Sequence, residues 1–224
     1  MCAARTDEQQ WLLAGYKRFR QGKYKEAADL FRELGQQQNP DVMVIACADS
    51  RADPSMIFDA APGQLFVVRN VAALVPPYDE SGGYHGVSAA VEFAVTALKV
   101  KQILVMGHAG CGGVTASLSA ADARPVGQFI APWVSLADET RDKVLADEAN
   151  DTPAKCQHAL EHSVVSLSIE NLMTFPFVRK AVDAGQLQLE GAWFSIGDGE
   201  LHWRNWKTGE FFLVDPKKDN PIVD

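Results

Sequence analysis

The chain has 224 residues, a net charge of −8 and a pI of about 5.1, with 47% apolar and 22% charged residues. These values are those of a globular chain with a buried core, in one domain or one domain with an arm. The acidic balance disfavours nucleic acid as a partner, because basic faces bind phosphate backbones. No apolar run approaches the roughly 20 residues that span a bilayer, and the first ten residues lack the pattern of a secretory signal. We therefore expect a cytoplasmic protein without a membrane partner.

Two amphipathic helices are predicted at the start of the chain, over residues 8–20 and 25–34, from apolar residues at helical spacing. Gly22 lies in the turn between them, and Gly35 is placed to end the second helix. Because this pair precedes the first strand, we expect residues 1–38 to form an N-terminal helical arm and residues 39–224 to form an α/β domain. Aromatic side chains on the arm are expected to pack on a partner chain or, alternatively, on their own domain.

From residue 41 onward the pattern alternates between strands and helices, which predicts an α/β fold with a central, mostly parallel β-sheet flanked by helices. Two tight turns near the end predict a C-terminal antiparallel hairpin, with strands at 201–206 and 211–214. The other predicted strands cover residues 42–46, 64–69, 102–106 and 189–196. The predicted helices cover residues 87–98, the segment after 113, and residues 132–148, 154–173 and 177–184.

Three potential metal ligands follow two of these strands. Cys47 comes directly after residues 42–46, and His108 and Cys111 come after residues 102–106. Sites in open α/β sheets form at the carboxyl ends of strands, so the three side chains converge if these strands are neighbours. Two thiolates and one imidazole hold one zinc ion and leave a position open for water, as in catalytic zinc sites. A helix starting at Gly112 would also lower the pKa of the Cys111 thiol.

The remaining cysteines and histidines carry no comparable pattern. Cys2 and Cys156 are expected to be free thiols or small buried side chains. His158 and His162 share a face of the long helix but lack a third ligand, so no second metal site is expected there. His85 is the candidate for proton transfer, although a solvated loop histidine is the alternative.

Asp49 and Arg51 follow Cys47 closely and would share the rim of the metal site. A carboxylate there can accept a hydrogen bond from a metal-bound water, and a guanidinium can hold that carboxylate off the metal. If the arginine let go, Asp49 could become the fourth ligand and close the site. The alternative is a surface ion pair that contributes little. Asp53 is expected to be a turn or capping residue.

The segments Cys-Ala-Asp-Ser-Arg at 47–51 and Gly-His-Ala-Gly-Cys-Gly-Gly at 107–113 resemble the β-class carbonic anhydrases of the plant-type subclass. The likeness continues through residues 66–72, 74–78 and 89–95 and is strong over residues 38–118. It implies zinc held by Cys47, His108 and Cys111, one ion per subunit, with Asp49 and Arg51 as the catalytic dyad. It also implies a parallel sheet extended by one antiparallel strand, and homodimers or homotetramers.

The resemblance further implies a carbonate dehydratase, a lyase that reversibly hydrates carbon dioxide to bicarbonate and a proton through zinc-bound hydroxide, in carbon utilization. Gln38 matches a glutamine that reaches toward the substrate across the dimer interface, and its amide can donate a hydrogen bond to a substrate oxygen. Phe66, Val71 and Phe93 match apolar positions of the substrate pocket, although the plant-type pattern has tyrosine at the place of Phe93. Gly112 matches a glycine whose backbone N–H can bond substrate.

Three other functions fit parts of the pattern. A hydrolase of carbon disulfide or carbonyl sulfide could use the same zinc core on similarly small, linear substrates. A non-catalytic zinc-binding homologue could keep the fold, although the presence of both Asp49 and Arg51 argues against it. A phosphate-binding loop at 107–113 is disfavoured, because the segment lacks the lysine and the spacing of a P-loop.

Overall fold

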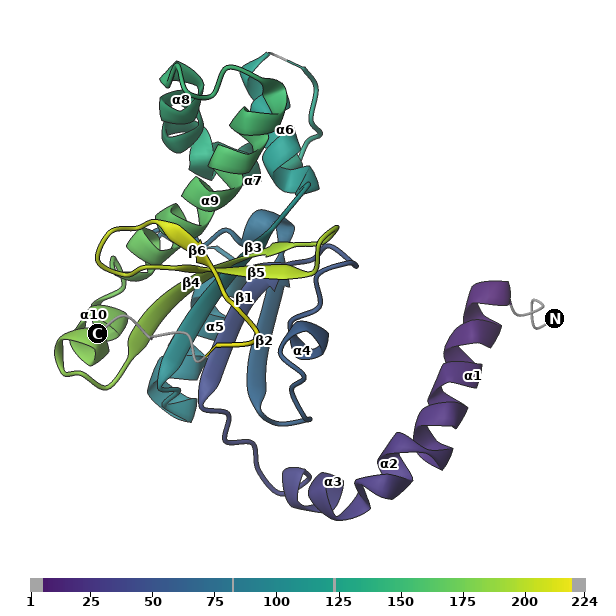
Figure 1. The fold of residues 1–224 in the computed structure, drawn as a ribbon. Helices are drawn as coiled ribbons and strands as arrows, with labels where there is room; N and C mark the ends of the chain where they lie inside the picture. The colour runs from purple at the N-terminus through teal and green to yellow at the C-terminus, as the bar shows by residue number, and fades with distance from the viewer. Residues whose placement is uncertain (1–5, 82, 123, 219–224) are drawn as a thin grey trace. The chain divides into compact units, whose positions relative to one another are not determined.

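The computed structural model describes residues 6–81, 83–122 and 124–218, so Cys2 lies outside the described residues. The chain divides into two compact units, residues 1–39 and residues 40–224. The described part of the first unit is helical, and the second contains a six-stranded sheet (Figure 1). In the described residues, no helix combines the length and the apolar character needed to cross a membrane.

The N-terminal unit begins with a capped helix. The Thr6 side chain accepts a hydrogen bond from the Gln9 backbone N–H, and the Gln9 side chain accepts one from the Thr6 N–H. The rings of Phe19, Tyr24 and Phe31 pack against one another with centroids 5.0–5.8 Å apart and join the three helices of this unit. These helices are α1 (Asp7–Gln21), α2 (Lys23–Glu26) and α3 (Ala28–Leu34).

The sheet of the second unit has the strand order β2-β1-β3-β4-β5-β6. The strands β1, β2, β3 and β4 run parallel, whereas β5 is antiparallel to β4 and β6 is antiparallel to β5. The predicted α/β class with its C-terminal antiparallel strands is therefore confirmed, although two strands extend the parallel part instead of one. The strands are β1 (Val42–Cys47), β2 (Leu65–Asn70), β3 (Gln102–His108), β4 (Gln188–Ser195), β5 (Glu200–Arg204) and β6 (Phe211–Leu213).

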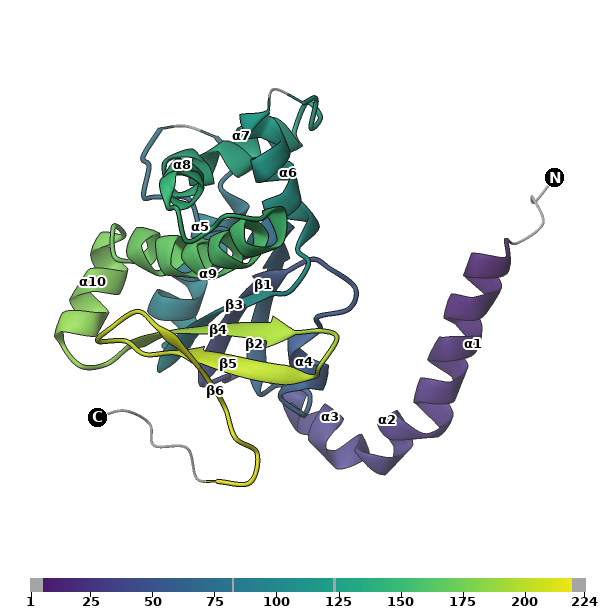
Figure 2. The ribbon, with the colours of Figure 1, turned by 45° about the horizontal axis from the view of Figure 1, so that its top comes forward.

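Strands β1 and β3 are buried on both faces, which explains why their sequences are continuously apolar. Alternate residues point to opposite faces of a strand. Ile45 and Val105 belong to a core shared with helices, including Val165 of α9 (Pro153–Leu172), whereas Val44 and Leu104 belong to a smaller core on the other face. Helix α9 lies across β3 and β4 in both views (Figure 2).

A third apolar cluster lies where β1 and β3 end. It joins Cys47 and Cys111 to Val114 and to Leu160 and Val164 of α9. The metal-ligand candidates are thus part of a core between strand ends and helices. The remaining helical elements are α4 (Pro54–Ile57), η1 (Val71–Ala73), α5 (Gly86–Glu92), η2 (Phe93–Leu98), α6 (Gly112–Ala121), α7 (Ile130–Val134), η3 (Ser135–Ala137), α8 (Asp138–Ala146) and α10 (Pro176–Asp183).

Several predicted helices differ in detail from the observed ones. The predicted helix at 25–34 is two helices, because Ala27 leaves helical geometry with φ −107° and ψ 28°. The predicted helix at 132–148 is α7, η3 and α8 in succession. The predicted helix at 87–98 changes after Glu92 from α-helical to π-helical geometry in η2. Sequence reasoning also missed α4, whose N-cap Asp53 accepts hydrogen bonds from the Ser55 and Met56 backbone N–H groups, so the expected capping role of Asp53 is confirmed.

Candidate metal centre

The neighbouring strands β1 and β3 bring the three predicted ligands together. Cys47 is the last residue of β1 and His108 is the last residue of β3. After His108 the chain turns at Gly110, whose φ of +64° is one that glycine adopts without strain. The turn delivers Cys111 to the N-cap position of α6. The convergence predicted for these strand ends is therefore observed.

The donor atoms of Cys47, His108 and Cys111 all lie within 4.8 Å of one another, and all three residues are buried. The two sulfur atoms are 3.9 Å apart. His108 Nδ1 lies 3.0 Å from the Ala109 carbonyl oxygen, which can only accept, so Nδ1 carries the proton and Nε2 keeps its lone pair. That Nε2 is buried and makes no hydrogen bond. The three residues also line a cavity of about 10 Å³.

These donors fit a zinc ion. Tetrahedral geometry with Zn–S bonds of about 2.3 Å places two sulfurs about 3.8 Å apart, close to the observed 3.9 Å. A disulfide would require about 2.05 Å, so the two cysteines are free thiols. A buried ring nitrogen without a partner calls for an explanation, and a metal ion supplies one. Zinc is among the ions that thiolate and imidazole donors both favour.

The contact between the two sulfur atoms shifts the pKa values of the two thiols in opposite directions. The hydrogen bond from Cys111, opposed by burial, lowers the pKa of Cys47 to about 4. The same hydrogen bond, together with burial, raises the pKa of Cys111 far above its usual range. The lowered pKa expected for Cys111 from the helix N-terminus is therefore wrong for the metal-free pair. Backbone N–H groups of Gly113 and Val114 do favour its thiolate, but the neighbouring sulfur outweighs them.

Asp49 and Arg51 form a two-point ion pair at the rim of the site. Arg51 Nε donates to Asp49 Oδ1 at 2.9 Å, and Arg51 Nη2 donates to Oδ2 at 2.7 Å. The Arg51 backbone N–H adds a third hydrogen bond, and Nη2 also reaches the Gly110 carbonyl oxygen at 3.3 Å. These contacts lower the pKa of the Asp49 carboxyl well below its usual range. Asp49 Oδ2 lies 3.9 Å from His108 Nε2, so the held carboxylate stays beside the donor group.

Arg69 fastens the loop that carries Cys47 and Asp49, and sequence reasoning missed it. Its guanidinium donates to the carbonyl oxygens of Cys47, Asp49 and Ala52, the first at 2.8 Å and the third at 3.3 Å. It also forms an ion pair with Asp53 at 3.1 Å. An arginine 16–22 residues from its partners leaves no local spacing signal, so only the fold reveals this role.

The structure brings only some of the predicted substrate-binding residues to the metal ligands. Val71 packs beside Gly113, since a Cβ on that glycine would lie 2.6 Å from Val71 Cγ1. Gly112 has open space where its side chain would be. Val71 also packs against the cluster that contains Cys111, and Gly112 is the next residue after Cys111. Gln38 is exposed and belongs to the N-terminal unit, and its role stays a prediction.

Phe66 and Phe93 lie away from the metal ligands of their own chain. Phe66 pairs with Met43, whereas Cys47 pairs with Asn70. Four residues of strand separate the two pairs, or roughly 13 Å at the usual rise. The ring of Phe93 lies 5.9 Å from that of Phe66, and its side chain is partly exposed.

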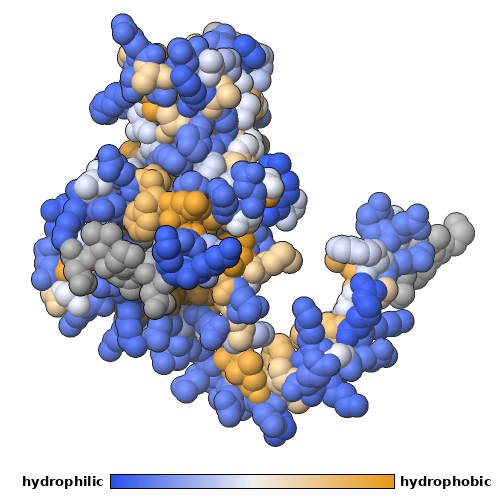
Figure 3. Space-filling model, in the orientation of Figure 1, coloured by the Kyte–Doolittle hydropathy of each residue, from blue (hydrophilic) through white to orange (hydrophobic). Residues whose placement is uncertain are grey.

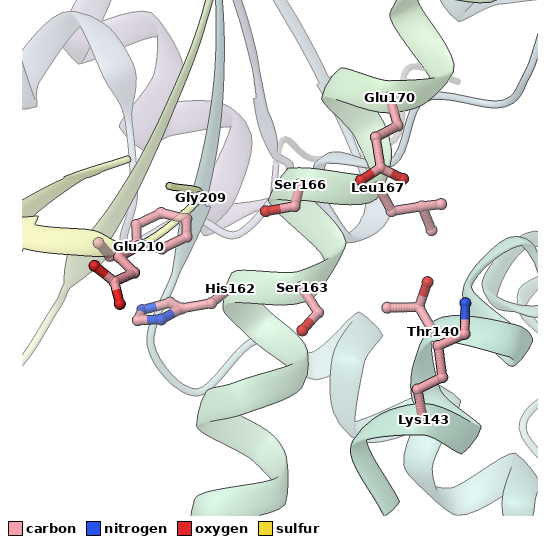
Figure 4. A pocket seen from close by; sticks show the side chains of 10 residues that line it. Thr140, Lys143, His162, Ser163, Ser166, Leu167, Glu170, Gly209 and Glu210 are labelled. Carbon is pink, nitrogen blue, oxygen red and sulfur yellow. The ribbon is translucent and has the colours of Figure 1, made fainter. Parts of the chain in front are cut away.

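A second hollow, of about 460 Å³, shares no lining residue with the metal cavity (Figure 4). Residues of α8, α9 and the connection into β6 line it, among them Lys143, His162 and Glu210. The rings of His158 and His162 lie 4.3 Å apart, as their spacing predicted. In the described part of the chain, however, the one group of three donors fit for a metal is that of Cys47, His108 and Cys111.

His85 and Cys156, two further candidates from the sequence, each contact a backbone carbonyl oxygen. His85 precedes α5, and its Nε2 lies 2.9 Å from the Ser81 carbonyl oxygen, so its part in proton transfer stays a prediction. Cys156 is a free thiol that donates to the Asn150 carbonyl oxygen. Sequence reasoning also missed Glu161, a buried carboxylate that lines the metal cavity. A glutamate within the apolar face of α9 is a signal that could have found it.

A mostly parallel sheet with two thiols and an imidazole at its strand ends defines an α/β protein with a three-ligand metal site. The sequence profile of the family described as carbonic anhydrase matches residues 42–201. Beta carbonic anhydrase 3 of Arabidopsis thaliana is 33% identical over 218 residues, which cover 94% of this chain and 83% of that protein.

Solved structures agree with the sequence comparison. The β-carbonic anhydrase CcaA superposes with a TM-score of 0.87 at 29% identity, covering 95% of this chain and 94% of that one. A tetrameric β-carbonic anhydrase of the ascomycete Sordaria macrospora gives a TM-score of 0.77 at 27% identity, over 88% of this chain and 97% of that one. The chain therefore belongs to the carbonic anhydrase family, in its β class, and zinc is its cofactor.

Proposed function

We propose that this chain reversibly hydrates carbon dioxide to bicarbonate and a proton, with Cys47, His108 and Cys111 holding one zinc ion per subunit. The observation that carries the proposal is the buried donor set, in which two sulfurs lie 3.9 Å apart beside a ring nitrogen that has no hydrogen-bond partner. Three protein ligands leave a fourth tetrahedral position for the reacting water. Family membership supports the same reaction.

Zinc, when bound, supplies a Lewis acid that lowers the pKa of a water molecule toward about 7. Asp49 accepts a hydrogen bond from the reacting water and orients its lone pair toward carbon dioxide, while Arg51 holds the carboxylate in place. The Gln38 amide and the Gly112 N–H donate to substrate oxygens as negative charge develops on them. Donors fixed before the reaction cost no reorganisation during it. The released proton passes to solvent, for which His85 is the proposed relay.

Zinc content and carbon dioxide hydration, measured on the same preparations, test the proposal. Cys47→Ala is expected to lose both stoichiometric zinc and activity. The matched control is Cys156→Ala, which removes a free thiol outside the donor set and should keep both. Full hydration activity in Cys47→Ala would overturn the proposed mechanism. Carbonyl sulfide assayed in parallel distinguishes the intended substrate from its sulfur analogue.

We also propose that the working unit is a homodimer or homotetramer, in which Phe66 and Phe93 line the pocket of a partner's metal site. Their distance from the metal ligands of their own chain supports this arrangement. Helix α1 has no buried residue and exposes Trp11 and Tyr16, which suits contact with a second copy. Figure 3 shows another apolar area where β4, β5 and β6 lie in Figure 1, and Leu213 of the edge strand β6 is exposed there.

Cytoplasmic location, with a part in carbon utilization, completes the proposal. The three described cysteines are all free thiols, which suits a reducing compartment. Bicarbonate is the product that carboxylating enzymes consume, so the chain would supply such a reaction. Fractionation of cells that express the tagged chain tests the location, and recovery with an organelle or the cell envelope would contradict it.

A further inference from the structure

A buried carboxylate lies against the turn that carries Cys111. Glu161 of α9 is only 3% exposed. Its Oε1 accepts hydrogen bonds from the Cys111 backbone N–H at 3.0 Å and from Gln157 Nε2 at 2.7 Å. Its Oε2 accepts one from the indole N–H of Trp193 at 3.1 Å. All three partners are donors, so both carboxylate oxygens of Glu161 act as acceptors.

Gln157 extends this contact to the other side of the Cys111 peptide unit. Its Nε2 also lies 3.1 Å from the Cys111 carbonyl oxygen, and its Oε1 accepts from the Thr115 hydroxyl at 3.1 Å. The backbone N–H and the backbone carbonyl of Cys111 are therefore both held by side chains of α9. We call Glu161 and Gln157 together the Cys111 clamp.

Packing alone does not account for a carboxylate at this position. Leu160, Val164 and Val165 surround Glu161 along α9, and all three belong to apolar cores. Burying a carboxylate there is costly unless it is hydrogen-bonded, and one of the three partners of Glu161 is the Cys111 backbone N–H. The turn that it contacts follows Gly110, and a glycine can adopt several backbone conformations because it has no Cβ. An external anchor is therefore what fixes the direction of the Cys111 side chain.

We propose that Glu161 is a positioning residue of the metal centre. Through the Cys111 clamp it holds the Cys111 sulfur facing Cys47 and His108, so that the donor set is assembled before zinc arrives. Groups that orient metal ligands in this way usually change metal affinity or activity 10- to 100-fold when they are removed. The inference rests on the proposed function, because it requires Cys111 to be a zinc ligand.

Substitutions at Glu161 are best compared in a Trp193→Phe background. A glutamine at 161 that offers its oxygen to the Cys111 N–H would turn its NH₂ toward the Trp193 N–H, and two donors would face each other. Trp193→Phe removes that conflict while it leaves the Cys111 contact in place. Trp193→Phe is thus the matched control for the double variants with Glu161→Gln and Glu161→Leu.

The primary measurement is the rate of zinc release from the loaded proteins into excess chelator. Trp193→Phe is expected to release zinc within about threefold of the unmodified chain, because both contacts of Glu161 Oε1 remain. Adding Glu161→Gln should keep the rate within about threefold, since an acceptor for Cys111 persists. Adding Glu161→Leu removes the acceptor and should speed release by about 10- to 100-fold. Two results would overturn the proposal. One is zinc release at the control rate after Glu161→Leu, and the other is zinc release that Glu161→Gln speeds as much as Glu161→Leu does.

A second measurement separates positioning from general support of the fold. Urea unfolding is followed for the zinc-loaded and the chelator-treated forms of each variant. A positioning role predicts that Glu161→Leu shrinks the extra stability that zinc confers, because zinc then binds the folded state less tightly. Equal destabilisation of both forms would instead show a purely structural residue and overturn the proposal.

Gln157→Leu provides an independent test if the double variant with leucine at 161 does not fold. It removes the hydrogen bonds of Gln157 with Cys111, Glu161 and Thr115 from a less buried position and should speed zinc release about 3- to 10-fold. An unchanged rate would overturn the clamp. If the unmodified chain held no stoichiometric zinc, the proposed function would fail. If the unmodified chain holds zinc and the Glu161 and Gln157 variants release it at the control rate, only the inference about Glu161 fails.

Discussion

The orientation of Asp49 decides how the rim of the metal site can act. Arg51 occupies both of its carboxylate oxygens, and the Arg51 backbone adds a third donor. With the carboxylate held in this way, the donor set consists of Cys47, His108 and Cys111 without it. The arrangement agrees with a carboxylate that accepts a hydrogen bond from the reacting water and is kept off the metal.

Replacing Asp49 with asparagine tests that role. Asp49→Asn keeps the shape but loses the charge and turns a donor toward Arg51, so we expect hydration to slow by about 10- to 100-fold with zinc content unchanged. Asp41→Asn is the control, because it makes the same change in an exposed ion pair with Lys101, before the first residue of β1 and away from the metal ligands. Stopped-flow hydration and metal analysis provide the two measurements. Unaltered rates, or loss of zinc from Asp49→Asn, would contradict the assigned role.

His162 gives the fold a dependence on pH that is independent of the metal ligands. Burial, with the nearby charges of His158 and His202, lowers the pKa of His162 to about 3. Between that value and an unfolded pKa near 6.5, the unfolded chain binds a proton that the folded chain does not. Stability is therefore complete above about pH 6.5 and declines as the pH falls, by at most about 1.4 kcal/mol per unit and by less for a partly exposed ring.

His162→Phe should reduce this loss. Phenylalanine keeps the stacking on Phe211, whose ring centroid lies 4.1 Å away, and it removes the titrating group. Urea unfolding of both proteins at about pH 7 and about pH 5 gives the comparison. We expect a smaller decrease for His162→Phe. A decrease as large as that of the unmodified chain would show that His162 is not the group responsible.

How far the sequence predicts individual residues depends on how local their signals are. Cys47 and His108 were found because each ends an apolar strand, where a polar or metal-binding side chain stands out. Arg69 and Glu161 were missed, since both act on backbone groups more than 15 residues away. The distance of Phe66 from the metal ligands could not be predicted from the sequence, because it depends on the register between β1 and β2.

At the scale of elements, the contact between α6 and η1 sets the position of the Cys111 turn. Gly113 lies so close to η1 that a Cβ would meet Val71 Cγ1 at 2.6 Å and Ala72 Cβ at 2.9 Å. Ala72 has a φ of +66°, a conformation that few alanines adopt. The backbone of η1 therefore has little freedom to move away from an added methyl group.

Gly113→Ala should destabilise the fold by about 1–3 kcal/mol, the usual range for overpacking a core. Gly86→Ala is the matched control, since a Cβ there meets nothing within 4 Å and helix α5 begins at that residue. Urea midpoints of the two variants give the comparison, and the control should be neutral or slightly stabilised. Equal midpoints for both would mean that α6 and η1 can separate without cost.

Periodicity predicted the strands well and the helices less completely. The strands were recognisable because buried parallel strands are short, continuous apolar runs. The change at Phe93 from α-helical to π-helical geometry adds a residue to a turn, and apolar spacing does not report it. The breaks between α7, η3 and α8 fall in a stretch without glycine, so no residue there marks a helix end.

For the whole molecule, the apolar core that stabilises the sheet is separate from the cluster that contains the metal-ligating cysteines. The larger core lies between the sheet and its helices, whereas the cluster with Cys47 and Cys111 lies at the ends of β1 and β3. Phe66 packs on the larger core and Phe93 packs on Phe66, and neither belongs to the cluster that holds the donors. Under the proposed assembly, a symmetric pair would place this apolar surface of one protomer at the metal ligands of its partner.

Complementation between two defective variants tests that assembly. Gln38→Ala keeps the metal ligands, and Cys47→Ala keeps Gln38, so each homodimer lacks one component of every site. If Gln38 acts across the interface of a two-fold dimer, a mixed dimer contains one complete site. Random pairing of equal amounts makes half of the dimers mixed, and hydration should recover to about a quarter of the activity of the unmodified chain. Coexpression with two different tags allows the mixed dimer to be isolated and assayed.

If Gln38 acts within its own chain, the mixed dimer will hold no complete site, and its activity will stay at the mean of the two parents. Hydration activity equal to that mean would contradict a site in which Gln38 of one protomer completes the metal site of the other.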